Sequence, residues 1–283
     1  MKKVLLNVSI ASVALLLWGC GTNNNNSSQD TSSKTKTEKK EPKKSSSKKA
    51  VHKSSTVSSS SSANAASSAS SANQGQQDKS SESRIETLNS ALNRSLGHVL
   101  LPQRDGLGEG SANLNARYTG NSANYTVYYS VGNSPKPLND PSVQNEVPYA
   151  TLYKKTYDSA SAAQGGINYH PASEDQGLPS VDLGHNITGH INAGAGQRYL
   201  HWNEGRWSLA VHAAAVNGED PAPTAKTIVN LLETHSLPVP NTIAAGEFEV
   251  SGTNKLTWQD GNTVYSIQGK SAETIIKMAE SMK

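Results

Sequence analysis

Side chains that could bind a metal ion are concentrated in residues 182–212. This stretch holds the kinds of ligand that zinc favours, namely Asp182, His185, His190, His201 and His212. However, it contains no His-Glu-x-x-His pair. The strand register expected below turns His201 away from the face of its neighbour Trp202, and nothing brings it towards His185. We therefore expect polar histidines on strands or loops, with no metal site and no cofactor.

Motifs for nucleophilic or phosphate chemistry are missing from the sequence. It has no Gly-x-Ser-x-Gly elbow of a serine hydrolase. The glycine-rich segment 105–110 follows a predicted helix and has no lysine, which is typical of a surface loop. Two pairs of adjacent acids, Glu174-Asp175 and Glu219-Asp220, lie in loops rich in proline and glycine, where solvated turns are expected. These patterns favour a protein that is not an enzyme.

Tyrosines are the more informative side chains. The chain has ten Tyr and only one Phe. Tyr125 and Tyr129 share one strand face, and Tyr149, Tyr153 and Tyr157 share another, because side chains alternate along a strand. If exposed, these rigid amphipathic rings would suit contact with a glycan or a peptide, so we take all five as candidate ligand-binding residues. The alternative is that tyrosine replaces phenylalanine in the core, with its hydroxyl at the edge.

The only cysteine, Cys20, follows a leader of distinctive composition. Lys2 and Lys3 precede the apolar stretch 4–18. That stretch is shorter than the ~20 residues that a membrane span requires, so it predicts a signal peptide over residues 1–19. One cysteine also excludes an intramolecular disulfide, and packing alone must stabilise the folded part.

The sequence Leu17-Trp18-Gly19-Cys20 resembles the bacterial lipobox. The resemblance implies that the Cys20 thiol is alkylated by diacylglycerol and that the leader is cut just before it. Trp18 departs from the small or β-branched residue usual at that position. Two or three acyl chains would anchor the protein stably at the extracellular face of the cell membrane.

The segment that follows, residues 20–83, predicts a disordered tether. Residues 21–83 contain no aromatic residue and are dominated by Ser, Lys, Asn and Ala, so they cannot bury enough apolar surface to fold. A flexible chain of this length reaches roughly 40 Å on average. The tether is basic, whereas the remaining chain is mildly acidic, and nothing there indicates a nucleic-acid partner.

The globular region begins with a predicted helix over residues 83–101. Its apolar residues recur every three or four positions, at Ile85, Leu88, Leu92, Leu96 and Val99. Ser83 and Glu86 have the spacing of a capping box. Pro102 is expected to end the helix.

An internal repeat organises the rest of the chain. Leu-Pro pairs delimit three possible units, 102–177, 178–236 and 237–283. Residues 187–211 align without a gap with residues 243–267, and the closing helices 227–233 and 274–280 also match. Glu204-Gly205 and Asp260-Gly261 take the place of two-residue hairpin turns. This register pairs Trp202 with Trp207, Leu200 with Leu209, Trp258 with Thr263, and Leu256 with Tyr265.

The expected architecture of residues 84–283 is therefore α+β. Antiparallel β meanders should carry helices on one face, in two or three strand-strand-strand-helix units. In the first unit we expect strands at residues 114–118, 125–131 and 148–157 and a short helix at 159–163. Unit one is the least regular of the three.

The C-terminal pattern Trp-x-x-Gly-x-x-x-Tyr-x-Ile, followed by residues 274–281, resembles the ends of domains of unknown function in Gram-positive envelope lipoproteins. Such domains are similar to lipoprotein-carrier-like half-barrels, which hold apolar ligands or partner chains. The resemblance implies a fold and assigns no site residues.

The leading functional hypothesis is a noncatalytic binding module at the cell surface. Its ligand would be a cell-wall polymer, a glycan or another envelope protein, and the lipid on Cys20 would hold it at the membrane. A wall-modifying hydrolase with an unrecognised carboxylate site is the first alternative. A purely structural envelope scaffold is the second.

Replacing the predicted lipid site tests the anchor. We expect Cys20→Ala to release the protein into the medium or to leave the leader uncut, whereas Thr22→Ala should behave as the wild type. Detergent phase partition and the N-terminal mass measure the outcome. A Cys20→Ala protein that partitions into detergent with its leader removed would contradict the lipobox prediction.

Overall fold

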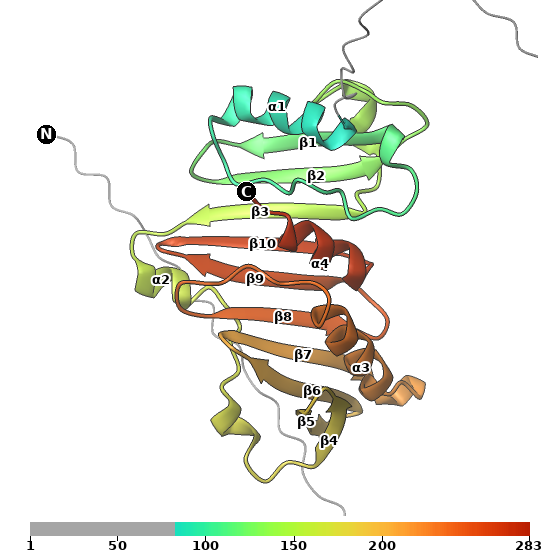
Figure 1. Cartoon of the computed structure of the whole chain (residues 1–283), viewed down its shortest axis with the longest axis vertical. Helices are drawn as coiled ribbons and strands as arrows, with labels where there is room; N and C mark the ends of the chain where they lie inside the picture. Colours follow the sequence, from blue (N-terminus) through green and yellow to red (C-terminus); the bar gives the residue numbers. More distant parts are fainter. Residues whose placement is uncertain (1–82) are drawn as a thin grey trace, which may run out of the picture. The chain divides into compact units, whose positions relative to one another are not determined.

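The computed structural model describes residues 83–283; the predicted signal peptide, Cys20 and nearly all of the tether lie outside this range. The described part confirms the α+β prediction, with ten strands in one open sheet and four α-helices (Figure 1). The order along the sheet is β1-β2-β3-β10-β9-β8-β7-β6-β5-β4. Every neighbouring pair is antiparallel except β7 and β8, which are parallel.

The strands fall into the three units of the sequence. Unit one supplies β1 (Leu114–Gly120), β2 (Tyr125–Val131) and β3 (Ala150–Thr156). Unit two supplies β4 (Ser180–Gly184), β5 (Ile187–Gly194), β6 (Gln197–Glu204) and β7 (Trp207–Ala214), and unit three supplies β8 (Ala244–Glu249), β9 (Asn254–Asp260) and β10 (Thr263–Gly269). Because β3 pairs with β10 and β7 with β8, the last unit of the chain lies in the middle of the sheet.

The hairpins of units two and three match, but the predicted turn was wrong by one residue. The two-residue loops are Gly205-Arg206 and Gly261-Asn262, with Gly205 at φ 57° and Gly261 at φ 61°. Glycine at the first loop position with a left-handed φ is typical of a type II′ turn. The loop shift moves the pairing by two residues, so the predicted partners are replaced by Trp202–Leu209, Leu200–Val211, Trp258–Tyr265 and Leu256–Ile267.

Because side chains alternate along a strand, a shift of two residues keeps every side chain on its predicted face. The apolar face is therefore as predicted, although the directly paired residues differ. Trp207 therefore lies on the same face as Trp202 but not directly opposite it. Its direct partner is Glu204.

Helix α1 (Arg84–Leu96) carries the predicted capping box, with the Ser83 side chain accepting from the Glu86 amide and the Glu86 carboxylate accepting from the Ser83 amide. The helix ends earlier than predicted. Gly97 follows it at φ 80°, a conformation that glycine adopts readily, and so the helix stops before Pro102 is reached. Val99, predicted to be helical, is instead part of the loop and packs at the margin of the core.

Three helices cover the same face of the sheet (Figure 1). Helix α1 lies by β1, α3 (Pro221–Leu232) by β4, β6 and β7, and α4 (Ala272–Glu280) by β9 and β10. The short α2 (Ala160–Gln164) lies on the opposite face, where Ala163 packs with Ala245 and Val264. Short 3-10 turns occupy Ser111–Asn113, Pro141–Asn145, Ala172–Asp175 and Ala215–Asn217. No helix of the described part is long and apolar enough to cross a membrane.

The core lies between the sheet and these three helices. Trp202 and Trp258 occupy equivalent places in the two matching hairpins, and each is 2 % exposed. Both belong to one cluster with Ile228 of α3 and Ile275 of α4. The indole N–H of Trp202 donates to the Glu204 carboxylate at 2.7 Å, so burial leaves no unpaired polar atom on that ring.

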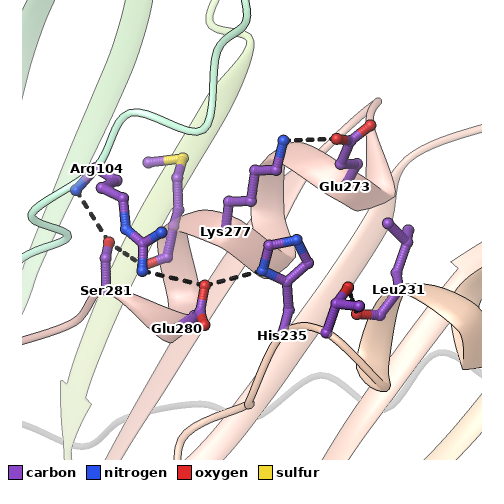
Figure 2. Close-up of polar contacts among 9 residues, drawn as sticks. Arg104, Leu231, His235, Glu273, Lys277, Glu280 and Ser281 are labelled. Atoms are coloured by element: carbon purple, nitrogen blue, oxygen red, sulfur yellow. Dashed lines mark hydrogen bonds and ion pairs between the residues drawn. The ribbon is translucent and has the colours of Figure 1, made fainter.

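A polar clasp on the helix side joins the three units (Figure 2). The Glu280 carboxylate of unit three lies 3.0 Å from His235 Nδ1 of unit two and 3.2 Å from Arg104 Nη2 of unit one. The Ser281 hydroxyl accepts from the backbone amides of Gln103 and Arg104. The hydrogen bond from His235 lowers the pKa of Glu280, and the nearby Arg104 lowers it further.

Truncating the equivalent tryptophans tests the duplicated core. Trp202→Ala and Trp258→Ala should each lower the free energy of unfolding by ~3–5 kcal/mol, because each ring fills a closed space in the same apolar layer. Val239→Ala is the control, since Val239 is 86 % exposed and should change stability little. Chemical denaturation measures the three values. A tryptophan variant that matches the control would show that its ring is not in the core.

The clasp predicts a pH-dependent contribution to stability. Because folding lowers the pKa of Glu280 from its ordinary value of 4.5, the ionised carboxylate stabilises the fold above that value, and the contribution is lost as pH falls through the lowered pKa. Glu280→Gln should therefore destabilise the protein at pH 7, and its difference from the wild type should shrink by pH 3. Glu273→Gln, at an exposed pair on the same helix, should change stability less at pH 7. A Glu280→Gln difference that is the same at both pH values would contradict this account.

Candidate functional site

The face of the sheet that points away from α1, α3 and α4 is polar, and we call it the polar face. Side chains alternate along each strand, so directly paired residues form rows across this face. One row, through successive strand partners, is Thr119, Thr126, Tyr153, Ser266, Thr257, Ala245, Ser208 and Asn203. A second row is Arg117, Tyr128, Thr151, Gln268, Lys255, Glu247, Ala210, His201 and His190. Hydroxyl, amide and charged groups dominate both rows.

Residues 157–178, which we call the strap, cross part of the polar face. They link β3, near the middle of the sheet, to β4 at its far edge. The Ala160 carbonyl accepts from the Gln259 side chain, Asn168 donates to Glu247, and the His170 amide donates to the Ser208 hydroxyl. In the described chain, the strap's hydrogen bonds to the sheet reach β6 to β9 and the turn after β9, which leaves unit one's part of the polar face open.

Two hollows meet at Tyr153 on this open part. The first, of about 570 Å³, lies at the ends of β1 to β3 and is lined by Thr119, Gly120, Asn124, Tyr125, Thr126, Tyr153, Lys154, Lys155 and Thr156. The second, of about 360 Å³, is lined by Arg117, Tyr128, Tyr149, Tyr153, Gln268, Lys270 and adjoining backbone. We call the area formed by Arg117, Tyr128, Tyr153, Lys155, Gln268 and Lys270 the Tyr153 surface.

Hydrogen bonds fix the position of Tyr153. Its hydroxyl oxygen accepts from Gln268 Nε2 at 2.8 Å and is also hydrogen-bonded to the side chain of Thr151. Burial raises the pKa of Tyr153, and the nearby Tyr128 raises it further, so the phenol keeps its proton at neutral pH. Because Gln268 donates to this oxygen, the phenol O–H remains a donor, either to Thr151 or to a ligand.

The Arg117 guanidinium is held beside Tyr153, and in the described part of the chain it has no carboxylate partner. Its guanidinium lies 4.5 Å from the centre of the Tyr128 ring, and Nη1 donates to the carbonyls of Val143 and Glu146 at 3.4 and 3.2 Å. The carboxylate of Glu146 turns elsewhere and accepts from Asn115 and Ser130. The guanidinium is therefore positioned by a ring face and two carbonyls rather than by a carboxylate.

The five tyrosines predicted from the sequence do not form one surface. Tyr125 and Tyr129 face the helices and are 3 % and 0 % exposed, with the Tyr125 hydroxyl donating to the Leu100 carbonyl. These two match the core alternative. Tyr149 lines the second hollow but donates its hydroxyl to the Asp105 carbonyl, and Tyr157, the first residue of the strap, packs against the cluster of Ala163, Ala245 and Val264. Of the five, Tyr153 is the one that lies between both hollows.

Sequence reasoning missed Arg117, Tyr128, Gln268 and Lys270. For Tyr128, the alternation of side chains along β2 could have indicated its place on the polar face. Tyr125 and Tyr129 share their face with Val127, which indicates the core, whereas Tyr128 shares its face with Thr126 and Ser130. The other three come to Tyr153 only through pairing between distant strands.

The histidines of residues 83–283 have separate local partners. His201 stacks on His170 of the strap with ring centres 4.2 Å apart, and His212 lies 2.6 Å from a Glu249 oxygen. His185 sits in the β4–β5 turn at φ 52°, and it contacts Asn230 of α3. Burial lowers the pKa of His201, and the neighbouring His170 lowers it further. Over residues 83–283, no group of three or more His, Cys, Asp or Glu is placed to hold a metal ion.

The adjacent acids have local structural partners. Glu174 and Asp175 both contact the His170 ring, and Asp175, at 2.8 Å from it, is itself almost fully buried. Glu219 accepts from the Ala214 amide, and Asp220 caps the start of α3. The glycine-rich segment 105–110 is a loop in which Asp105 accepts from the Leu107 amide.

No known protein family, curated protein or solved structure matches this chain. We therefore infer the function from the chemistry of the polar face.

Proposed function

We propose that this chain is a lipid-anchored surface protein whose folded part binds an extended ligand at the Tyr153 surface without transforming it. The lipobox-like sequence ending at Cys20 and the Ser/Lys-rich residues 21–83 support display on a tether at the outer face of the cell membrane. The sheet supports the binding role.

The observation that carries the proposal is the open, pre-positioned polar group around Tyr153. Tyr153 is fixed by Gln268, and Arg117 by the Val143 and Glu146 carbonyls. A ligand that binds there orders few side chains, so little conformational entropy opposes binding. The rings of Tyr128 and Tyr153 add rigid amphipathic contact area beside the hydrogen-bonding groups.

The arrangement of the two hollows favours a chain-like ligand. The row through Thr126 and Tyr153 and the row through Tyr128 and Thr151 lie two residues apart along the strands, about 7 Å. The hollows extend in opposite directions from Tyr153, towards Thr156 on one side and towards Lys270 on the other. A polymer running along β2 and β3 would fill both, whereas a compact small molecule would fill one.

The lining of the hollows supports binding rather than hydrolysis. A glycan hydrolase generally places two carboxyl groups on either side of the bond that it cleaves. No Asp or Glu lines either hollow in the described part of the chain. The nearby Glu146 carboxylate is held by Asn115 and Ser130.

Cell-wall sedimentation with the soluble mature chain, lacking the lipid, tests this function. Tyr153→Ala should weaken association with isolated Gram-positive cell walls by about tenfold, since a central aromatic contact is worth on the order of 1–2 kcal/mol. The matched control is Tyr199→Ala, which removes an exposed tyrosine from the polar face at β6. An equal loss in both variants, or wild-type sedimentation of Tyr153→Ala, would contradict a binding role for the Tyr153 surface.

A further inference from the structure

The Tyr153 surface is cationic although the folded part is acidic. Residues 83–283 contain 14 Lys and Arg against 18 Asp and Glu, a net charge of −4. The two hollows are nevertheless lined by Arg117, Lys154, Lys155 and Lys270 and by no acid. Across the described residues, none of these four cations has a carboxylate within ion-pair distance.

On the neighbouring strand of the same row, a cation is paired. Lys255, one strand beyond Gln268 in the same row, lies 3.2 Å from the Glu247 carboxylate. Lys277 and Arg104 on the helix side also have carboxylate partners. Other cations of the described part, such as Arg198 on β6, also lack a carboxylate partner, but the hollows bring several cations together with no acid in their lining. The local potential there attracts an anion.

Three groups of the second hollow can donate hydrogen bonds to a ligand. Arg117 keeps N–H groups beyond the Nη1 that binds two carbonyls, and Lys270 has three N–H donors and no acceptor. The Tyr153 hydroxyl accepts from Gln268, so its own proton can be donated to Thr151 or to a ligand. A ligand that satisfies all three must be rich in acceptor oxygens and negatively charged.

We propose that the hollow between Arg117, Tyr153 and Lys270 binds the phosphate groups of a linear phosphodiester polymer. The proposal rests on the binding function above and specifies its ligand. The donors reach the hollow from β1, from β3 and from the end of β10, and the divergent oxygens of a tetrahedral phosphate can meet them from different directions. A carboxylate, by contrast, has its two oxygens in one plane and pairs best with a single bidentate donor such as a guanidinium. Lys155, which shares the face of Tyr153, would attract the next phosphate of the chain, whereas Lys154 points to the other face and lies over the Tyr125 and Tyr265 rings.

Calorimetry with the soluble mature chain and a synthetic poly(glycerol phosphate) oligomer tests the ligand. The wild type should bind, and its affinity should fall as salt rises. Arg117→Gln and Lys270→Gln should each weaken binding by about tenfold, the loss expected for one charge-assisted hydrogen bond. Arg117→Lys keeps the charge but loses the paired N–H donors of the guanidinium. Its affinity for the oligomer should lie between that of the glutamine variants and that of the wild type. The control is Arg198→Gln, an exposed arginine on β6, which should bind as the wild type does.

Different outcomes separate this inference from the function on which it rests. If the oligomer does not bind, or polygalacturonate binds as tightly, the phosphate proposal is overturned. The sedimentation result for Tyr153→Ala would still decide the binding function. If Arg117→Gln unfolds at a lower temperature than the wild type, Lys270→Gln decides. Lys270 is exposed, its side chain has no ion pair in the described part, and the substitution keeps the backbone carbonyl that accepts from Asn254. Unchanged affinity in Lys270→Gln would then overturn the proposal.

Discussion

The antiparallel pairing of β3 with β10 is the interaction on which the rest of the structure depends. It joins residues 150–156 to residues 263–269, so the sheet is completed only by the last unit of the chain. It also aligns Tyr153 with Ser266 and brings Gln268 within hydrogen-bonding distance of the Tyr153 hydroxyl. The clasp at Glu280 supports this long-range pairing from the other side of the sheet, since it ties all three units together near the C-terminus.

The placement of unit three in the centre has a second consequence. The chain must travel from β3 to β4 at the far edge, and the strap makes this crossing over the polar face. There the strap forms hydrogen bonds with polar side chains of the sheet, such as Gln259 and Ser208. Without the strap, these side chains would face solvent. Unit one's part of that face lies on the other side of β10 and stays open. The topology therefore both builds the Tyr153 surface and leaves it accessible.

Local sequence patterns predicted what depends on local physics. Hydrophobic spacing and the capping box located α1, and the repeat located the matching hairpins, because periodicity and turn chemistry act over a few residues. The predicted hairpin register was wrong because glycine can occupy either position of a two-residue loop. The predicted end of α1 was wrong because Gly97 ends the helix before Pro102 is reached. The neighbours of Tyr153 could not be predicted, since non-local strand pairing brings Arg117 and Gln268 to it and no local pattern specifies that pairing.

The most direct test of the central claim, that the open polar face of units one and three binds the ligand, is a map of the ligand footprint. Backbone amide NMR spectra of the isotope-labelled soluble mature chain can be recorded during titration with poly(glycerol phosphate). We expect the largest shifts to cluster at Arg117, Tyr128, Thr151, Tyr153 and Gln268, with little change in α1, α3 and α4. Shifts centred on the helices or on the strap, with β2 and β3 unchanged, would contradict it.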